Sequence, residues 1–312
     1  MTYAVIDLGS NSVRLAVYDC EEDKMNKVFT KKEIVGLAGY IEKGMLADEG
    51  VQAACVVLND FRETAEKLVD PANIYLFATA SLRNIDNRDE VVDAITRETT
   101  LVPDLLEGQE EAALGFAGAS RFASCENGIM IDVGGASTEL VLFKDFEAVD
   151  MISLPIGCLN LSLKYVKDII PSEKEYRQIK AAVSGQLSKI EWDDGTKYPL
   201  MVGVGGTLRA ALKLSHAFFE TAPEESAIEA KQIKTLVKLL KTRDNDVYRT
   251  LFKFVPERLH TISAGLTILQ QVIKEFGCKT IYVSQYGLRE GYMIERVLTE
   301  GVEHDEIKGN RR

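Results

Sequence analysis

The sequence is poor in histidine and has no paired cysteines. Its 312 residues include three histidines (His216, His260 and His304) and five scattered cysteines. This pattern excludes a disulfide framework and the usual zinc-ligand spacing. The histidines are too dispersed for a histidine-centred catalytic or metal site. We therefore interpret the cysteines as buried thiols in a reducing cytoplasm.

Long apolar runs and an excess of positive charge are also absent. The longest apolar stretches, such as AALGFAGA from Ala112, are far shorter than the roughly 20 residues that span a bilayer. The N-terminal MTYAVIDLG has no basic segment or cleavable apolar stretch before its first expected strand. The net charge of −11 gives no general attraction to nucleic acid polymers or anionic membranes. We expect a cytoplasmic globular protein that binds neither, and an anionic substrate then requires local positive groups.

The sequence does contain one motif twice, as AVIDLGSNSV from Ala4 and IMIDVGGAST from Ile129. In each copy an apolar run ends in an aspartate, and glycine and small polar residues follow. Such glycines let backbone N–H groups approach a phosphate closely, and Asp7 and Asp132 are suited to hold a divalent cation. A single motif of this kind is more often a β-hairpin with an Asp-Gly turn, but two matched copies favour phosphate binding. The candidate phosphate-binding residues of the two motifs are Gly9, Ser10, Asn11, Ser12, Gly134, Gly135, Ser137 and Thr138.

The expected elements repeat around these motifs, which predicts an α/β fold with two duplicated halves. Three strands are expected in each half: Tyr3–Asp7, Val13–Tyr18 and Val28–Val35, then Gly128–Asp132, Glu139–Phe143 and Ala148–Leu154. Helices and strands alternate after each set, and one helix is expected over Ile228–Lys241. We predict domains at 1–122 and 123–312, with a last helix at about 294–312 as a candidate to pack back on the first domain.

Six motifs together resemble one known family. They are IDLGSNSVRL, ATASLRN, EGQEEA, IDVGGASTEL, GVGGTLRA and VSQYGLREG, which begin at Ile6, Ala78, Glu107, Ile131, Gly203 and Val283. In this order they resemble the exopolyphosphatase and guanosine pentaphosphate phosphohydrolase (Ppx/GppA) family of the actin, sugar kinase and heat-shock ATPase superfamily. The resemblance implies two actin-like (ribonuclease H-like) domains, an interdomain cleft for phosphates, and Mg²⁺ or another divalent cation as cofactor.

The resemblance also implies roles for single residues. Glu110 matches the catalytic glutamate that deprotonates the attacking water, and Asp132 and Glu139 match acids associated with the metal. Arg83 and Arg289 match arginines near the phosphate path, and Gly205 and Gly206 match a loop on the nucleoside side. Without the resemblance, Glu110 is a helix first-turn acid, Glu139 a solvated strand residue, the arginines members of surface ion pairs, and the glycines an ordinary strand-to-helix turn.

The expected activity is metal-dependent release of terminal phosphate from inorganic polyphosphate or of the 5′-phosphate from guanosine pentaphosphate. The alternative is a catalytically weak regulator that binds guanosine tetraphosphate or pentaphosphate, and a kinase is disfavoured by GQEEA and GLREG. Ala136 stands where the family usually has a glycine, and Asn160 stands near a usual basic residue. The chain also ends soon after GLREG, without the helical domains of longer members, which we expect to weaken the grip on long polymers. The preferred substrate, the chain length and a homodimeric state stay open.

Overall fold

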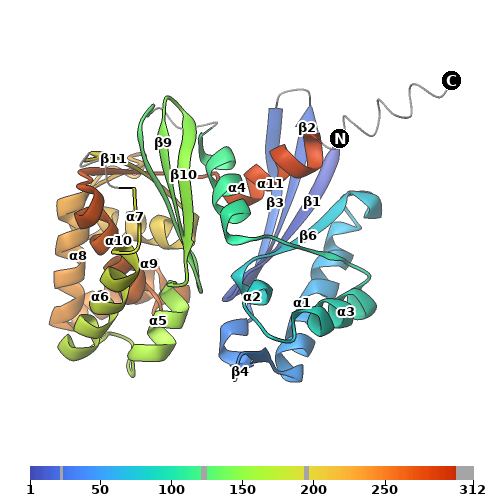
Figure 1. The fold of residues 1–312 in the computed structure, drawn as a ribbon, viewed down its shortest axis with the longest axis horizontal. Coiled ribbons are helices and arrows are strands. Elements are labelled where there is room, and N and C mark those ends of the chain that lie inside the picture. The colour runs from blue at the N-terminus through green and yellow to red at the C-terminus, as the bar shows by residue number, and fades with distance from the viewer. Residues whose placement is uncertain (22–23, 121–124, 193–196, 300–312) are drawn as a thin grey trace. The chain divides into compact units, whose positions relative to one another are not determined.

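The computed structural model describes residues 1–21, 24–120, 125–192 and 197–299 (Figure 1). The chain divides into two compact units, Met1–Gly108 and Gln109–Arg312. The predicted domain boundary at 122/123 lies outside the described residues. Helix α4 (Gly108–Ser120) belongs to the second unit except for its first residue, because its apolar face packs on the sheet of that unit.

The first unit is built on a five-stranded sheet in the order β3-β2-β1-β6-β7. The strands are β1 (Thr2–Leu8), β2 (Ser12–Glu21), β3 (Lys24–Ile34), β6 (Ile74–Ala78) and β7 (Pro103–Leu105). The first three form an antiparallel meander, and β6 and β7 run parallel to β1. Alternate residues of β1 and β2, such as Ile6 and Leu15, point into one buried core.

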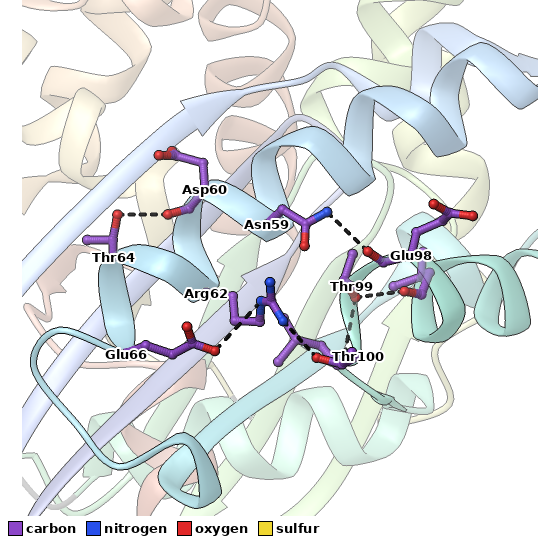
Figure 2. Close-up of polar contacts among 10 residues, drawn as sticks. Asn59, Asp60, Arg62, Thr64, Glu66, Glu98, Thr99 and Thr100 are labelled. Carbon is purple, nitrogen blue, oxygen red and sulfur yellow. Dashed lines mark hydrogen bonds and ion pairs between the residues drawn. The ribbon is translucent and has the colours of Figure 1, made fainter.

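The helices α1 (Asp48–Ala65) and α3 (Arg88–Thr99) cover that core. Their contact is also polar (Figure 2): Asn59 Nδ2 donates to Glu98 O at 3.2 Å, and Arg62 Nη1 donates to Thr100 Oγ1 at 3.0 Å. Thr100 ends α3 in the left-handed region, with φ of 60°. The side chains of α1 therefore hold the end of α3. Short elements complete the unit: η1 (Leu37–Tyr40), β4 (Ile41–Glu42), β5 (Met45–Leu46), η2 (Pro71–Asn73) and α2 (Ala80–Arg83).

The second unit has a six-stranded sheet in the order β10-β9-β8-β11-β13-β12. The strands are β8 (Gly128–Val133), β9 (Thr138–Lys144), β10 (Glu147–Leu154), β11 (Leu200–Val204), β12 (Ala227–Glu229) and β13 (Thr280–Val283). Again three strands form an antiparallel meander, and the next two, β11 and β13, run parallel to β8. The predicted duplication is confirmed by this match of strand order and direction.

Helices cover both faces of this second sheet (Figure 1). On one face lie α5 (Cys158–Tyr165), α6 (Glu173–Leu187), α7 (Gly205–Phe219), α8 (Ala230–Thr242), α9 (Asn245–Phe254) and the central helix α10 (Ile262–Phe276). Helix α4 covers the other face, where Phe116 and Phe143 have ring centroids 5.3 Å apart. The short helix η3 (Pro256–Arg258) precedes α10. After β13 the chain forms α11 (Leu288–Tyr292) and then the π-helical segment η4 (Met293–Leu298).

Strand β3 begins at Lys24, four residues before the predicted Val28. The predicted helix over Ile228–Lys241 begins only at Ala230, since Ile228 pairs with Ile281 in β12. Most of the predicted last helix at about 294–312 lies outside the described residues, whose last helical part is η4 and Thr299. Across the described ranges, no helix combines the length and the apolar character needed to cross a membrane.

Candidate functional site

The glycine loop between β8 and β9 is anchored by its carbonyl groups to the start of α5. Cys158 N donates to Gly134 O at 2.9 Å, and Leu159 N donates to Gly135 O at 2.9 Å. The Asn160 side chain donates to Ala136 O at 2.8 Å and accepts from Gly157 N at 2.8 Å. The departure from the family pattern at Asn160 thus has a structural role in fixing this loop.

This anchoring orients the N–H groups of the same loop. In a trans peptide the C=O of one residue and the N–H of the next point in opposite directions, and the described residues contain no cis peptide. Because the carbonyls of Gly134, Gly135 and Ala136 face α5, the N–H groups of Gly135, Ala136 and Ser137 point away from it. Successive N–H groups directed to one side form an anion-binding nest.

The loop between β1 and β2 repeats this arrangement in the first unit. Gly9 N donates to Ser12 O at 3.2 Å, as Gly134 N donates to Ser137 O at 3.0 Å. The carbonyl of Asn11 accepts from Gly36 N at 2.9 Å, and that of Ser10 accepts from Ala38 N at 3.1 Å. The N–H groups of Asn11 and Ser12 therefore point away from the 35–38 segment. The two copies of the motif adopt one loop geometry.

Asp132 and Glu139 lie side by side on the sheet face that α4 covers. They are directly opposite each other in the β8–β9 pair. Strand residues alternate between faces, so both share a face with Met130 and Val141, which pack under α4. Glu139 is 1% exposed, and its Oε1 accepts from Ser153 Oγ at 2.8 Å. A solvated strand position for Glu139 is excluded, and a buried carboxylate requires such partners.

The Asp132 carboxylate also lies against the first residue of α7. A Cβ placed on Gly205, whose φ is +82°, would be 2.1 Å from Asp132 Oδ1. Helix N-termini carry partial positive charge. The glycine pair of GVGG therefore brings a helix N-terminus to the acid, a closer relation than an ordinary strand-to-helix turn requires.

Arg209 of α7 lies within electrostatic reach of Asp132 and of a second arginine, Arg289. Burial lowers the pKa of the Arg209 guanidinium, and the charge of Arg289 lowers it further, whereas Asp132 and Glu290 act in the opposite direction. Arg289 of α11 and Arg209 of α7 are thus close enough to affect each other electrostatically. They are two positive side chains in a chain of net charge −11.

Glu110 and Arg83 have defined partners inside their own units. Glu110, in the first turn of α4, accepts from Arg296 Nη2 through Oε1 at 2.6 Å, and its side chain is 42% exposed. Arg83 Nη1 donates to Leu106 O at 2.7 Å and so holds the segment that leads into α4. Among the described residues no three His, Cys, Asp or Glu side chains form a group that could hold a metal ion.

Known proteins match almost the whole chain. The model of the Ppx/GppA phosphatase family matches residues 16–300. This chain belongs to the Ppx/GppA phosphatase family. The guanosine-5′-triphosphate,3′-diphosphate pyrophosphatase of Vibrio campbellii is 27% identical over 319 residues, covering 99% of this chain and 60% of that protein. The chain thus spans about 60% of the length of such relatives.

Solved structures agree with this membership. A crystal structure of the Aquifex aeolicus Ppx/GppA family member has a TM-score of 0.78 at 27% identity and covers 96% of this chain and 98% of that one. An exopolyphosphatase from Cytophaga hutchinsonii has a TM-score of 0.82 at 22% identity, covering 94% and 97%, and this likeness concerns the fold alone. The predicted family and the actin-like, duplicated fold are confirmed.

Sequence reasoning about the Ppx/GppA motifs missed three arginines. Arg14 stands opposite Asp7 in the β1–β2 pair, where the second unit has Glu139 opposite Asp132, and its Nε lies 3.4 Å from Ser12 Oγ. Alignment of the two motif copies would have singled out Arg14. Arg209 lies within the quoted GVGGTLRA motif. No sequence signal indicated Arg296, because its position depends on the π-helical turn.

Proposed function

We propose that this chain is a phosphohydrolase that releases terminal phosphate from inorganic polyphosphate or the 5′-phosphate from guanosine pentaphosphate. The observation that carries the proposal is the row of N–H groups at Gly135, Ala136 and Ser137, beside the carboxylates of Asp132 and Glu139. Family membership and the names of the relatives support the same reaction class. The loop of the first unit has a matching geometry and is the second candidate for phosphate binding.

Catalysis of phosphoryl transfer requires an aligned water molecule and neutralisation of the phosphate oxygens, because the transition state is loose and anionic. We assign Glu110 as the general base, since its carboxylate is partly exposed and can meet a water molecule. Arg289 and the loop N–H groups neutralise charge, and a guanidinium matches phosphate oxygens in a bidentate manner.

The acids of the second unit suit magnesium. Mg²⁺ is usually held by one or two carboxylates together with substrate phosphates and water, and Asp132 and Glu139 are two carboxylates adjacent in register. These two residues would hold the ion, whereas Asp7 of the first unit stands opposite Arg14 and is the weaker candidate. The bound ion would supply additional neutralisation of the phosphate oxygens.

The test is phosphate release by the purified chain with short polyphosphate, long polyphosphate and guanosine pentaphosphate, each with Mg²⁺ or with a chelator. We expect Mg²⁺-dependent release from at least one substrate. Glu110→Gln preserves side-chain shape but removes the proton acceptor, so kcat should fall by about 10²–10⁴ with little change in KM. No release by a folded chain from any of the three would contradict the proposal.

The regulator that binds guanosine tetraphosphate or pentaphosphate is the second candidate. Ala136 favours it, because the family usually has a glycine at this position of the loop. Calorimetry separates the two functions: tight binding of guanosine tetraphosphate without phosphate release from guanosine pentaphosphate would establish the regulator.

A further inference from the structure

Helices α4 and α11 approach each other at backbone distance. A Cβ on Gly118 would lie 2.1 Å from Gly287 O, and a Cβ on Gly291 would lie 1.7 Å from Leu114 O. Only glycine permits such contacts. Gly118 is paired with Gly287, and Leu114 is paired with Gly291. Residue numbers thus fall along α4 as they rise along α11, so the two helices run antiparallel.

The next contact in this series is the ion pair of Glu110 with Arg296. Along α4 the contacts step by four residues, which is the spacing of one α-helical face. Along the partner the first step is also four, from Gly287 to Gly291, but the next step is five. A regular α-helix would therefore direct Glu295 toward Glu110.

The π-helical segment η4 explains the step of five. Residues 293–298 form this segment, and a π-helix closes its turns between residues five apart. The wider turn puts Arg296 opposite Glu110 and leaves Glu295 exposed. The π turn thus exchanges a repulsive pair of carboxylates for a charge-assisted hydrogen bond of 2.6 Å.

Stability alone does not account for this arrangement. Both side chains are about two-fifths exposed, at 42% for Glu110 and 38% for Arg296, and exposed ion pairs contribute little to folding. π turns are rare in helices and frequently occur at functional sites. The π turn is therefore better explained by a role of the Glu110 carboxylate, which the Arg296 guanidinium holds in place.

We propose that Arg296 is a positioning residue for Glu110. Its guanidinium binds Oε1 at 2.6 Å and fixes the plane of the carboxylate that accepts the proton from water. The inference rests on the proposed role of Glu110 as the base. In this proposal Arg296 acts through Glu110 and takes no part in the chemistry itself.

The test compares kcat and KM of several variants under the conditions that give phosphate release. Arg296→Ala should lower kcat on the order of 10- to 100-fold with KM nearly unchanged, since a misplaced catalytic group costs rate rather than binding. Arg296→Lys should recover part of the loss. The exchange Glu295→Arg with Arg296→Glu keeps composition and charge but moves the guanidinium off Glu110, and its kcat should be at least as low as that of Arg296→Ala.

Two controls separate this inference from the proposed function. Glu295→Ala alters the exposed neighbour on the same turn and should keep wild-type kcat. In a Glu110→Gln background Arg296→Ala should cause no further loss, because the two residues act as one unit. If Glu110→Gln lowers kcat but Arg296→Ala leaves it equal to or above the wild-type value, the positioning role is wrong and the base assignment stands. If Glu110→Gln keeps normal turnover, or the wild type releases no phosphate, both inferences are overturned.

Discussion

At the residue scale, Gly205 determines where the Asp132 carboxylate can lie. Two features require glycine there: the positive φ of +82° and the 2.1 Å separation between a Cβ and Asp132 Oδ1. The positive φ concerns only the backbone of Gly205. The short separation concerns Asp132, because a side chain at residue 205 would displace its carboxylate from the start of α7 and from its place beside Glu139.

Gly205→Ala should therefore reduce both the free energy of unfolding and the apparent affinity for Mg²⁺. The backbone cost of a left-handed conformation is about 1–2 kcal/mol, measurable by urea unfolding. The displaced Asp132 should raise the Mg²⁺ concentration needed for half-maximal phosphate release. Gly36→Ala is the matched control for stability, because Gly36 also has positive φ, +67°, but no atom lies within 4 Å of its Cβ position. Equal stability losses with equal Mg²⁺ requirements in the two variants would show that the contact with Asp132 has no consequence.

At the element scale, the glycine contacts of α4 and α11 set the position of Glu110. Gly291 meets the carbonyl of Leu114, a backbone atom that cannot rotate away. Any side chain at residue 291 must push the two helices apart. The same movement would separate Glu110 from Arg296, which are joined one turn further along.

Gly291→Ala should lower the free energy of unfolding by at least about 1–3 kcal/mol, the usual cost of overpacking. Phosphate release should fall as well. Gly185→Ala on α6 is the control, since no atom lies within 4 Å of its Cβ position. That variant should gain about 1 kcal/mol from helix propensity. Thermal unfolding of the pair tests the contact, and an unchanged Tm for Gly291→Ala would contradict the packing described here.

Sequence patterns predicted the strands and loops whose own residues show a clear apolar run or glycine motif. The apolar runs that end at Asp7 and Asp132 sufficed for β1 and β8, and the glycine motifs sufficed for both loops. Strand β12 has only three residues and depends on pairing with β13, so its pattern merged with that of α8. A capping box marks the true start of α8, since Glu229 N donates to Gln232 Oε1 at 2.7 Å.

Packing determined the parts of the site that sequence reasoning missed. The hydrogen bond of Arg296 with Glu110 depends on the π turn, and the π turn has no periodic signature in six residues. From the sequence, Asn160 indicated only that the basic residue common in the family is missing there. In the structure its side-chain amide donates to Ala136 O and holds the loop. Such roles follow only from the positions of neighbouring elements.

At the scale of the whole molecule, both units contain the same antiparallel meander with two further parallel strands, but the charge opposite the motif aspartate differs. Across β1 and β2, Asp7 stands opposite Arg14, whereas across β8 and β9 Asp132 stands opposite Glu139. The second unit therefore presents two carboxylates, which suit Mg²⁺. The first presents a carboxylate beside a guanidinium, which suits a phosphate. The two units thus share strand and loop geometry, and the residue opposite the motif aspartate differs in charge.

This difference predicts unequal responses to magnesium. Asp132→Asn and Glu139→Gln should each lower phosphate release about 10- to 100-fold at low Mg²⁺, as lost support of a metal site usually does, and high Mg²⁺ should restore a large part of it. Asp7→Asn should also lower release, but high Mg²⁺ should restore much less, because the neighbouring Arg14 contributes no metal ligand. Asp150→Asn, an exposed residue of β10, is the matched control and should behave as the wild type. Titration of Mg²⁺ for the four variants decides the point. Equal rescue of Asp7→Asn and Asp132→Asn would mean that both units hold the metal and that the charge difference is without effect, whereas normal release by Asp7→Asn would leave the first loop as a hairpin without a part in the reaction.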